Sequence, residues 1–368
     1  MENKTVAVIC EYNPFHFGHK YQLDLLHEQG YNVISIMSGN TVQRGETALF
    51  EKYSRAKTAL CNGADVVVEL PFPYSMTSAV DFARSGVALA KGLGVDALAF
   101  GCESPELVFE LARFLSDERV RTELRTIVER EKNISMPKAR QMLVREKLGE
   151  KYAEAVKKPN NILALEYIIA CGDELLALPI LRDQTKLSAT YLRSLDKKEM
   201  MENLPPMSDG ITIDGKKLES AVLSKLRMMS VETLGEIYDC VGGTEYRLKK
   251  SAFESNSIDA LVELLINADT TTARAKRLIR NAFFGVTKES VHTPPQYTVL
   301  LGAKKGMTSI LGRATLPIIT RMSDSARLGS ETAKSMYRAH VTADSVVALA
   351  FGERVPFYPT KCAPVIIS

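Results

Sequence analysis

The sequence lacks the features that mark a secreted or membrane-spanning protein. Its six cysteines are scattered and include no C-x-x-C pair, which argues against a disulfide framework and a zinc site and suits a reducing compartment. Charged residues interrupt every long apolar stretch, so no transmembrane helix is expected. The opening residues, MENKTVAVIC, contain too short an apolar run for a signal peptide. These absences predict a cytoplasmic protein with no membrane partner.

The chain also lacks a strong charge of either sign and the glycine-rich motif of P-loop proteins. Its formal net charge is +3 over 368 residues, so any surface that binds nucleic acid must be local. No Walker A sequence is present, which disfavours a P-loop kinase or ATPase. The remaining composition, 45% hydrophobic and 25% charged, is that of an ordinary folded protein. The length allows two domains, or one large domain with an appendage.

The first hundred residues alternate short apolar runs with helical segments. Strands are predicted at residues 6–10, 32–37, 65–70 and 95–100, and helices between them at residues 18–28, 51–63 and 75–91. Alternation at this spacing predicts an α/β fold with a parallel sheet and helices on both faces. We therefore expect a Rossmann-like domain over residues 1–200.

Beyond that domain the pattern turns helical. Residues 201–368 are expected to form a mainly helical region with a small α+β end. The segment LPPMSDG, residues 204–210, is rich in turn residues and is the best candidate for a linker. The helices of this region are predicted at residues 219–227, 231–240, 257–267 and 271–284.

The segment NPFHFGH follows the first predicted strand, where open parallel sheets bind their ligands. Pro14 fixes the turn, and Gly18 lets the backbone approach a ligand without a Cβ in the way. His16 and His19 should lie on one side of the first helical turn, beside unpaired N–H groups and the positive end of the helix dipole. This arrangement predicts a phosphate site. Zinc is the rival ligand, but no third ligand is close in sequence, so no metal held by protein side chains is expected.

The H-x-G-H pattern resembles the signature of the nucleotidyltransferase superfamily, which includes pantetheine-phosphate adenylyltransferases and class I aminoacyl-tRNA synthetases. The segment SATYLR is similar to the S-x-T-x-x-R element that such enzymes place at another helix start, against the outgoing phosphates. Ser188 and Thr190 suit an N-cap and a phosphate donor, and Arg193 would lie one turn further on. Alone, SATYLR could be an ordinary capping box. Both signatures in order favour nucleotide binding.

Five segments in order narrow the resemblance: EYNPFHFGH, SGNTVQRGE, GADVVVELPFPY, FGCES and PNNILALEYI. They closely resemble the bacterial tRNA(Met) cytidine acetate ligase family, whose members activate acetate with ATP and acetylate N4 of the wobble cytidine, position 34, of elongator tRNA(Met). The resemblance implies a ligase with ATP, acetate and this tRNA as partners and Mg²⁺ accompanying the ATP. No protein partner is inferred. Thr47 departs from the pattern where proline is expected. YTVLLGA, residues 297–303, lacks an expected arginine, which puts one RNA contact in doubt.

The same resemblance assigns the site residues. It implies that residues 1–200 activate acetate as acetyl-adenylate, with His16 and His19 as catalytic residues that stabilise the charge on the phosphates. Gln43 and Arg44 are candidates for contact with acetate or the incoming base. The ATP-binding residues implied are Ala7, Val8, Ile9, Cys10, Glu11, Tyr12, Asn13, Pro14, Phe15, His16, Phe17, Gly18, His19, Lys20, Gly101, Asn160, Arg182, Ser188, Thr190 and Arg193.

The segment TTARAKRLIRNAFFG predicts a basic helix face in the second region. Its cationic residues follow one another at steps of three and four: Arg274, Lys276, Arg277 and Arg280. Such a face is usually only solvated. Because a tRNA substrate needs contacts to its backbone, we expect residues 201–368 to bind tRNA through these side chains.

Two other functions remain open from the sequence. The chain could be an adenylyltransferase that acts on a small phosphorylated metabolite or carboxylate, without RNA. It could also be an RNA-binding protein that keeps an idle nucleotide pocket. The complete pair of phosphate signatures argues against the idle pocket, and the long basic helical extension argues against a minimal small-molecule enzyme. Glu69, at the end of the third predicted strand, could face the site or emerge into solvent.

Overall fold

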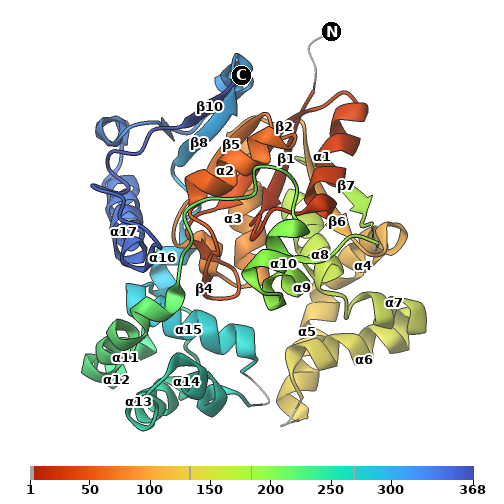
Figure 1. Cartoon of the computed structure of the whole chain (residues 1–368). Coiled ribbons are helices and arrows are strands. Elements are labelled where there is room, and N and C mark those ends of the chain that lie inside the picture. The colour runs from red at the N-terminus through yellow and green to blue at the C-terminus, as the bar shows by residue number, and fades with distance from the viewer. Residues whose placement is uncertain (1–3, 132–133, 184, 268–269) are drawn as a thin grey trace.

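The fold is built around one mostly parallel β-sheet (Figure 1), seen in a computed structural model that describes residues 4–131, 134–183, 185–267 and 270–368. The strands of the sheet in these ranges are β1 (Thr5–Cys10), β2 (Asn32–Ser38), β5 (Val66–Leu70), β6 (Ala97–Cys102), β7 (Leu176–Leu181), β8 (Thr298–Lys304), β9 (Ile318–Ile319) and β10 (Val365–Ile367). Their order is β10-β8-β5-β2-β1-β6-β7, and β9 pairs with β8. Neighbouring strands run parallel except β5 and β8, which are antiparallel. A separate hairpin consists of β3 (Thr41–Val42) and β4 (Glu46–Thr47).

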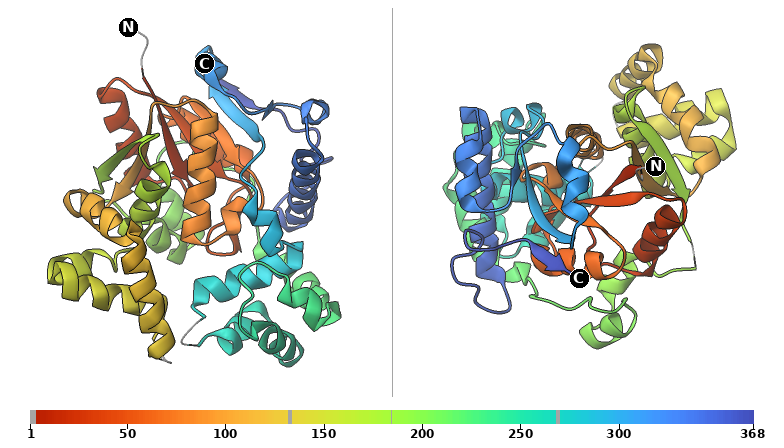
Figure 2. Two further views of the ribbon diagram at one scale, coloured as in Figure 1. Left: turned by 180° about the vertical axis from the view of Figure 1, so that it is seen from behind. Right: turned by 90° about the horizontal axis from the view of Figure 1, so that it is seen from above.

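Helices cover both faces of this sheet, as the strand–helix alternation predicts. The α-helices of the first half are α1 (Phe17–Glu28), α2 (Lys52–Cys61), α3 (Ala79–Gly92), α4 (Pro105–Ser116), α5 (Glu118–Arg130), α6 (Met136–Leu148), α7 (Glu150–Ala155), α8 (Pro159–Cys171), α9 (Ala189–Ser194) and α10 (Lys197–Glu202). Val6 and Val8 of β1 pack with α1 and α2, whereas Ala7 and Ile9 pack with α3, α4 and α8. Figures 1 and 2 show α2 and α3 on opposite faces of the sheet.

The ends of two predicted helices differ from the structure because side chains cap them. α2 begins at Lys52, since the Glu51 carboxylate accepts the N–H of Ser54 as an N-cap. The helix predicted at residues 75–91 is a short 3₁₀ turn, Tyr74–Met76, followed by α3. Ser78 caps α3 by accepting the N–H of Asp81. Local capping therefore sets where these helices start.

The second half of the chain is mainly helical before it returns to the sheet. Its α-helices are α11 (Glu219–Met228), α12 (Val231–Gly235), α13 (Thr244–Glu254), α14 (Ile258–Leu265), α15 (Thr272–Phe284), α16 (Lys288–His292) and α17 (Glu331–Val347), and its 3₁₀ helices are Gly215–Leu218, Met307–Arg313, Met322–Arg327 and Ala348–Ala350. α11 to α15 pack around a core that also includes Val42 of β3 and Ala48, the residue after β4. Among the described residues, no helix is both long and apolar enough to cross a membrane.

The prediction of a helix over residues 231–240 is wrong beyond Gly235, where α12 ends. There the backbone leaves the helix, because Ile237 forms a β-bridge with Thr287 and the N–H of Tyr238 donates to the carbonyl of Val286. Asp239 then adopts a positive φ of 69°. Pairing with a segment about fifty residues away replaces the local helix.

The predicted linker at residues 204–210 contains no helix or strand, but it is not detached from the fold. Thr58 and Asn62 of α2 donate side-chain hydrogen bonds to the carbonyls of Met207 and Pro206. Ser208 is buried. The segment therefore runs along α2 and ties the two halves of the chain together.

The final part of the chain completes the sheet that the first part begins. β8 lies directly against β5, and β10 lies against β8. Figure 1 shows these strands beside β5 at one edge of the sheet, with α17 next to them. The sheet therefore extends past the boundary predicted at residue 200.

Candidate active site

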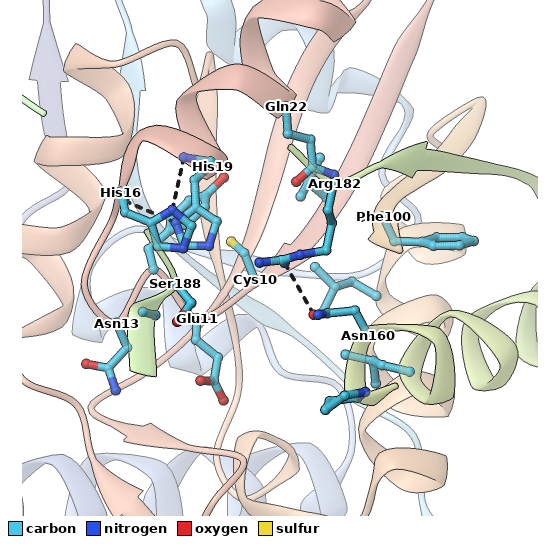
Figure 3. A pocket seen from close by; sticks show the side chains of 18 of the residues that line it. Cys10, Glu11, Asn13, His16, His19, Gln22, Phe100, Asn160, Arg182 and Ser188 are labelled. Carbon is cyan, nitrogen blue, oxygen red and sulfur yellow. Dashed lines mark hydrogen bonds between the residues drawn. The ribbon is translucent and has the colours of Figure 1, made fainter. Parts of the chain in front are cut away.

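A cavity of about 410 Å³ opens at the carboxyl ends of β1, β6 and β7. This volume lies within the range of small-molecule sites, and the place is the one where parallel sheets bind ligands. The lining residues include Cys10 to Asn13 at the end of β1 and just beyond it, Gly101 near the end of β6, Arg182 after β7, Asn160 of α8, and the start of α9. Four stretches that are separated in the sequence thus meet at one sheet edge (Figure 3).

Both predicted catalytic histidines line this cavity, and their hydrogen bonds fix which ring nitrogen carries the proton. The N–H of Gly18 donates to Nδ1 of His16 over 3.0 Å, and the N–H of His16 donates to Nδ1 of His19 over 3.2 Å. A neutral imidazole that accepts at Nδ1 carries its hydrogen on Nε2. The two rings stack with centroids 3.6 Å apart. The pair therefore offers two neutral Nε2–H donors.

The environment keeps both histidines uncharged at neutral pH. Burial of the ring, with further contributions from Arg182 and Arg193, lowers the pKa of His16 from 6.5 to about 4. Burial, the neighbouring His16 ring and Arg182 hold the pKa of His19 well below its usual value. The expected phosphate site thus takes its positive charge from the two arginines. The N–H of Gly18 at the helix start, which we expected to be unpaired, is satisfied by the His16 ring.

Gly101, Asn160 and Arg182 lie together on the other side of the cavity. Arg182 donates through Nη1 to the side-chain oxygen of Asn160 over 3.3 Å (Figure 3). Asn160 in turn donates to the carboxylate of Glu103 over 2.6 Å. A Cβ on Gly101 would lie 3.1 Å from Cγ of Arg182, so glycine lets this arginine pack against the end of β6.

The SATYLR segment forms α9 and contacts the first motif. Ser188 is the N-cap, as predicted, and accepts the N–H of Tyr191 over 3.2 Å. Arg193 donates through Nη1 to the backbone carbonyl of Asn13. Thr190 lines the cavity between them. The two signatures that resemble phosphate-binding elements thus meet at one site.

Gln43 and Arg44 reach the cavity from the loop between β3 and β4. The N–H of Gln43 donates to the Glu11 carboxylate over 2.7 Å, which joins this loop to the end of β1. Arg44 is exposed. The loop therefore contributes one polar and one cationic side chain to the mouth of the site.

Five of the expected ATP-binding residues do not line the cavity. They lie in β1, in the turn after it or at the start of α1: Ala7, Pro14, Phe15, Phe17 and Lys20. Ala7 lies in the sheet core, Phe15 packs against Tyr12, and Lys20 pairs with Asp24 at 2.8 Å. Their contribution is to shape the turn and helix that hold the histidines.

Sequence reasoning missed several lining residues that carry polar groups, among them Gln22, Asp183 and Lys186. Gln22 follows His19 by three positions on α1, a spacing that places both side chains on one helix face and could have indicated it. Its Nε2 is buried and has no partner among the described residues. Lys186 is exposed at the cavity just before α9. A lysine in a loop gives no such periodic signal.

Comparisons with known proteins agree with this geometry. The HIGH nucleotidyl transferase family matches residues 3–356. A curated tRNA(Met) cytidine acetate ligase from Syntrophomonas wolfei is 31% identical over 87% of this chain and 87% of its own. The ligase of that name from Streptococcus mutans is 33% identical over 81% of this chain and 83% of its own. This chain belongs to the tRNA(Met) cytidine acetate ligase family.

Solved structures extend the similarity over the whole fold. A crystal structure of Thermotoga maritima TmcAL bound with alpha-thio ATP has a TM-score of 0.90, 27% sequence identity and 99% coverage of both chains. The apo form of that protein has a TM-score of 0.89 and 28% identity. The strand and helix arrangement described above is therefore that of a ligase-family nucleotidyltransferase fold.

The four cationic residues predicted to bind tRNA do not form an unoccupied basic face. Lys276 pairs with Glu46 at 2.6 Å, and Arg277 pairs with Asp239 at 2.7 Å. Arg274 lies 3.9 Å from Asp239, and Arg280 is buried. Because Glu46 belongs to β4, α15 packs against the hairpin that carries Gln43 and Arg44.

One buried cluster, not the histidine pair, has the ligand set of a metal site. Within the described ranges, Glu69, His340 and Asp344 form the group of three or more acidic, histidine or cysteine side chains close enough to hold an ion. Lys52 already occupies it, with Nζ 2.7 Å from Glu69 and in contact with Asp344. Glu69 therefore faces neither the site nor solvent, contrary to both expectations, because an ammonium group compensates its charge in the core.

Proposed function

We propose that this protein is an ATP-dependent ligase that forms acetyl-adenylate and acetylates N4 of the wobble cytidine of elongator tRNA(Met). The observation that carries the proposal is the stacked His16–His19 pair, whose two Nε2–H donors share a cavity with Arg182 and Arg193. This donor set suits a triphosphate, and the family relationship supplies acetate and tRNA as the other substrates.

Activation of acetate needs positioning and charge neutralisation. An acetate oxygen attacks the α-phosphorus of ATP, the bond to pyrophosphate breaks, and a mixed anhydride of acetate and AMP forms. His16 and His19 donate hydrogen bonds to phosphate oxygens and need not gain or lose a proton. Arg182 and Arg193 supply positive charge near the leaving pyrophosphate. Mg²⁺ would enter with ATP and neutralise part of its charge.

Transfer to tRNA requires RNA contacts at the mouth of the cavity. Arg44 and Lys186 are exposed cationic residues of the lining, and we propose that they meet the anticodon loop. The division of the chain into an activating part, residues 1–200, and an RNA-binding part, residues 201–368, remains part of the proposal. The half-exposed Arg274, Lys276 and Arg277 are its remaining candidates on α15, whereas Arg280 supports the packing of that helix.

The test is a pair of assays with one preparation of the protein. Without tRNA, it should catalyse ATP–pyrophosphate exchange that depends on acetate. With ATP, labelled acetate and tRNA, it should produce N4-acetylcytidine in elongator tRNA(Met). The proposal would be overturned if a phosphorylated metabolite supports exchange and neither acetate nor any other carboxylate does. That result would favour a small-molecule adenylyltransferase.

A further inference from the structure

Two carboxylates line the cavity within the described part of the chain, and they differ in how their oxygens are used. Asp183 accepts the N–H and the hydroxyl of Thr185 at 2.9 and 2.6 Å, and lies 3.7 Å from Lys186. Glu11, at the carboxyl end of β1, accepts one hydrogen bond, from the N–H of Gln43 to Oε1 over 2.7 Å. Asp183 is therefore engaged with its own loop, and Glu11 retains accepting capacity.

The second oxygen of Glu11 is open to the cavity. Among the described residues, Oε2 has no hydrogen-bond donor, and no cationic group lies within 4 Å of the carboxylate. It is also absent from the buried polar atoms that lack a partner, so it is not sealed from solvent. Figure 3 shows the Glu11 side chain directed away from the two imidazole rings. The carboxylate thus lies on the side of the Gln43–Arg44 loop, away from the phosphate donors.

The environment makes Glu11 a stronger base than an ordinary glutamate. Burial raises the pKa of its carboxyl group, and the Gln43 N–H and the charges of Arg193, Arg55 and Arg44 offset only part of this effect. The two histidines are unsuited to accept a proton from substrate, because Nδ1 of each ring is already an acceptor for a backbone N–H. Their remaining nitrogens carry hydrogen and, in the proposed function, donate to phosphate.

We propose that Oε2 of Glu11 is the general base that accepts the proton of the cytidine N4 amine during acetyl transfer. This inference rests on the proposed function. As the N4–carbon bond forms, the bond between the acetyl carbon and the phosphate oxygen of AMP breaks. The N4 proton passes to Glu11, AMP leaves as the phosphate monoester, and the neutral carboxyl group later returns the proton to solvent.

The decisive measurement is single-turnover transfer from preformed acetyl-adenylate to tRNA. Glu11→Gln keeps a side-chain oxygen that can accept the Gln43 N–H, so it preserves the anchoring of the loop and removes only the base. We expect the transfer rate constant to fall by about 10²-fold or more, and by more than the rate of ATP–pyrophosphate exchange falls in the same variant. Asp183→Asn is the matched control for a lost carboxylate in the lining and should lower transfer by less than about tenfold.

The pH profile of the wild-type protein supplies a second readout that does not depend on how a variant folds. The transfer rate constant should rise with pH as a single group, Glu11, loses its proton, and then level off, because only the carboxylate form accepts a proton. The pH at half-maximal rate should lie above 4.5, since burial raises the pKa of Glu11. Glu11→Gln should lack this rise. A wild-type profile without the rise, or a Glu11→Gln variant that transfers at the wild-type rate, would overturn the inference and assign the proton to a phosphate oxygen of acetyl-adenylate. Absence of acetylated tRNA with the wild type would instead refute the proposed function.

Discussion

His16 caps α1 with one ring nitrogen and has the other available for the cavity that its side chain lines. Nδ1 accepts the N–H of Gly18 and caps α1, with the backbone of His16 extended at φ −139° and ψ 171°. The usual N-cap residues are Ser, Thr, Asp and Asn, whose side chains are shorter than that of histidine and do not reach as far beyond the helix start. Histidine caps the helix and still has an N–H at Nε2 for the cavity. The cap also fixes the tautomer that makes this donor available.

The two roles can be separated by substitution. Asparagine at position 16 can cap α1, but its short amide places no donor at the position of Nε2. His16→Asn should therefore keep the stability of the wild type and slow acetate-dependent exchange by about 10²-fold. His16→Ala should slow exchange similarly and also lower the free energy of unfolding by about 1 kcal/mol, the cost of a lost cap. Urea denaturation and exchange assays on both variants check this. Full exchange activity in His16→Asn would remove Nε2 of His16 from the mechanism.

At the scale of elements, the cluster around Lys52 fastens α17 to the sheet. Lys52 is on α2, Glu69 is on β5, and His340 and Asp344 are one turn apart on α17. Burial opposes a charge on His340, but Glu69 and Asp344 outweigh it and raise the pKa of His340 to about 9. Two cations and two carboxylates therefore balance one another in the core.

Removing one of these two cations should lower the free energy of unfolding substantially. Lys52→Met leaves two buried carboxylates with a single positive partner, and breaking a buried ion pair in this way typically costs about 3–5 kcal/mol. Lys57→Met, on the exposed face of the same helix, should change the free energy of unfolding by less than about 0.5 kcal/mol. Denaturant unfolding of the two variants measures the difference. Equal stability of both would show that the cluster adds nothing to the attachment of α17.

The elements that could be predicted from the sequence are those whose structure depends on neighbouring residues. The strands of the first hundred residues, their helices and the H-x-G-H turn follow from local periodicity and turn chemistry, and the structure confirms them. The partners of α15 do not, because Asp239 and Glu46 come from distant segments. The same limit applies to Glu69, whose partner His340 is 271 positions away. An ion pair between distant segments can bury a charged residue that looks exposed in the sequence, and nothing in the neighbouring residues indicates this.

At the scale of the whole molecule, the residues that line the cavity come from the first half of the chain, whereas the strands of the sheet come from both halves. Every lining residue of the cavity in the described ranges lies at or before Arg193. The sheet, however, needs β8 and β10, which begin at Thr298 and Val365. β8 covers the edge of β5, all of whose residues are buried. The first half therefore contains the whole described lining of the cavity but not all the strands of the sheet that supports it.

A fragment of residues 1–200 should accordingly contain every lining residue and still be inactive. Without β8, the edge of β5 would expose unpaired backbone groups and apolar side chains, which promotes aggregation. Lys52 and Glu69 would also lose His340 and Asp344. We expect the fragment to show no cooperative thermal unfolding and no acetate-dependent exchange, and we expect both to return when residues 201–368 are co-expressed as a separate chain. A soluble fragment that unfolds cooperatively and catalyses exchange would show that residues 1–200 are an independent domain, and that β8 joins a sheet already stable without it.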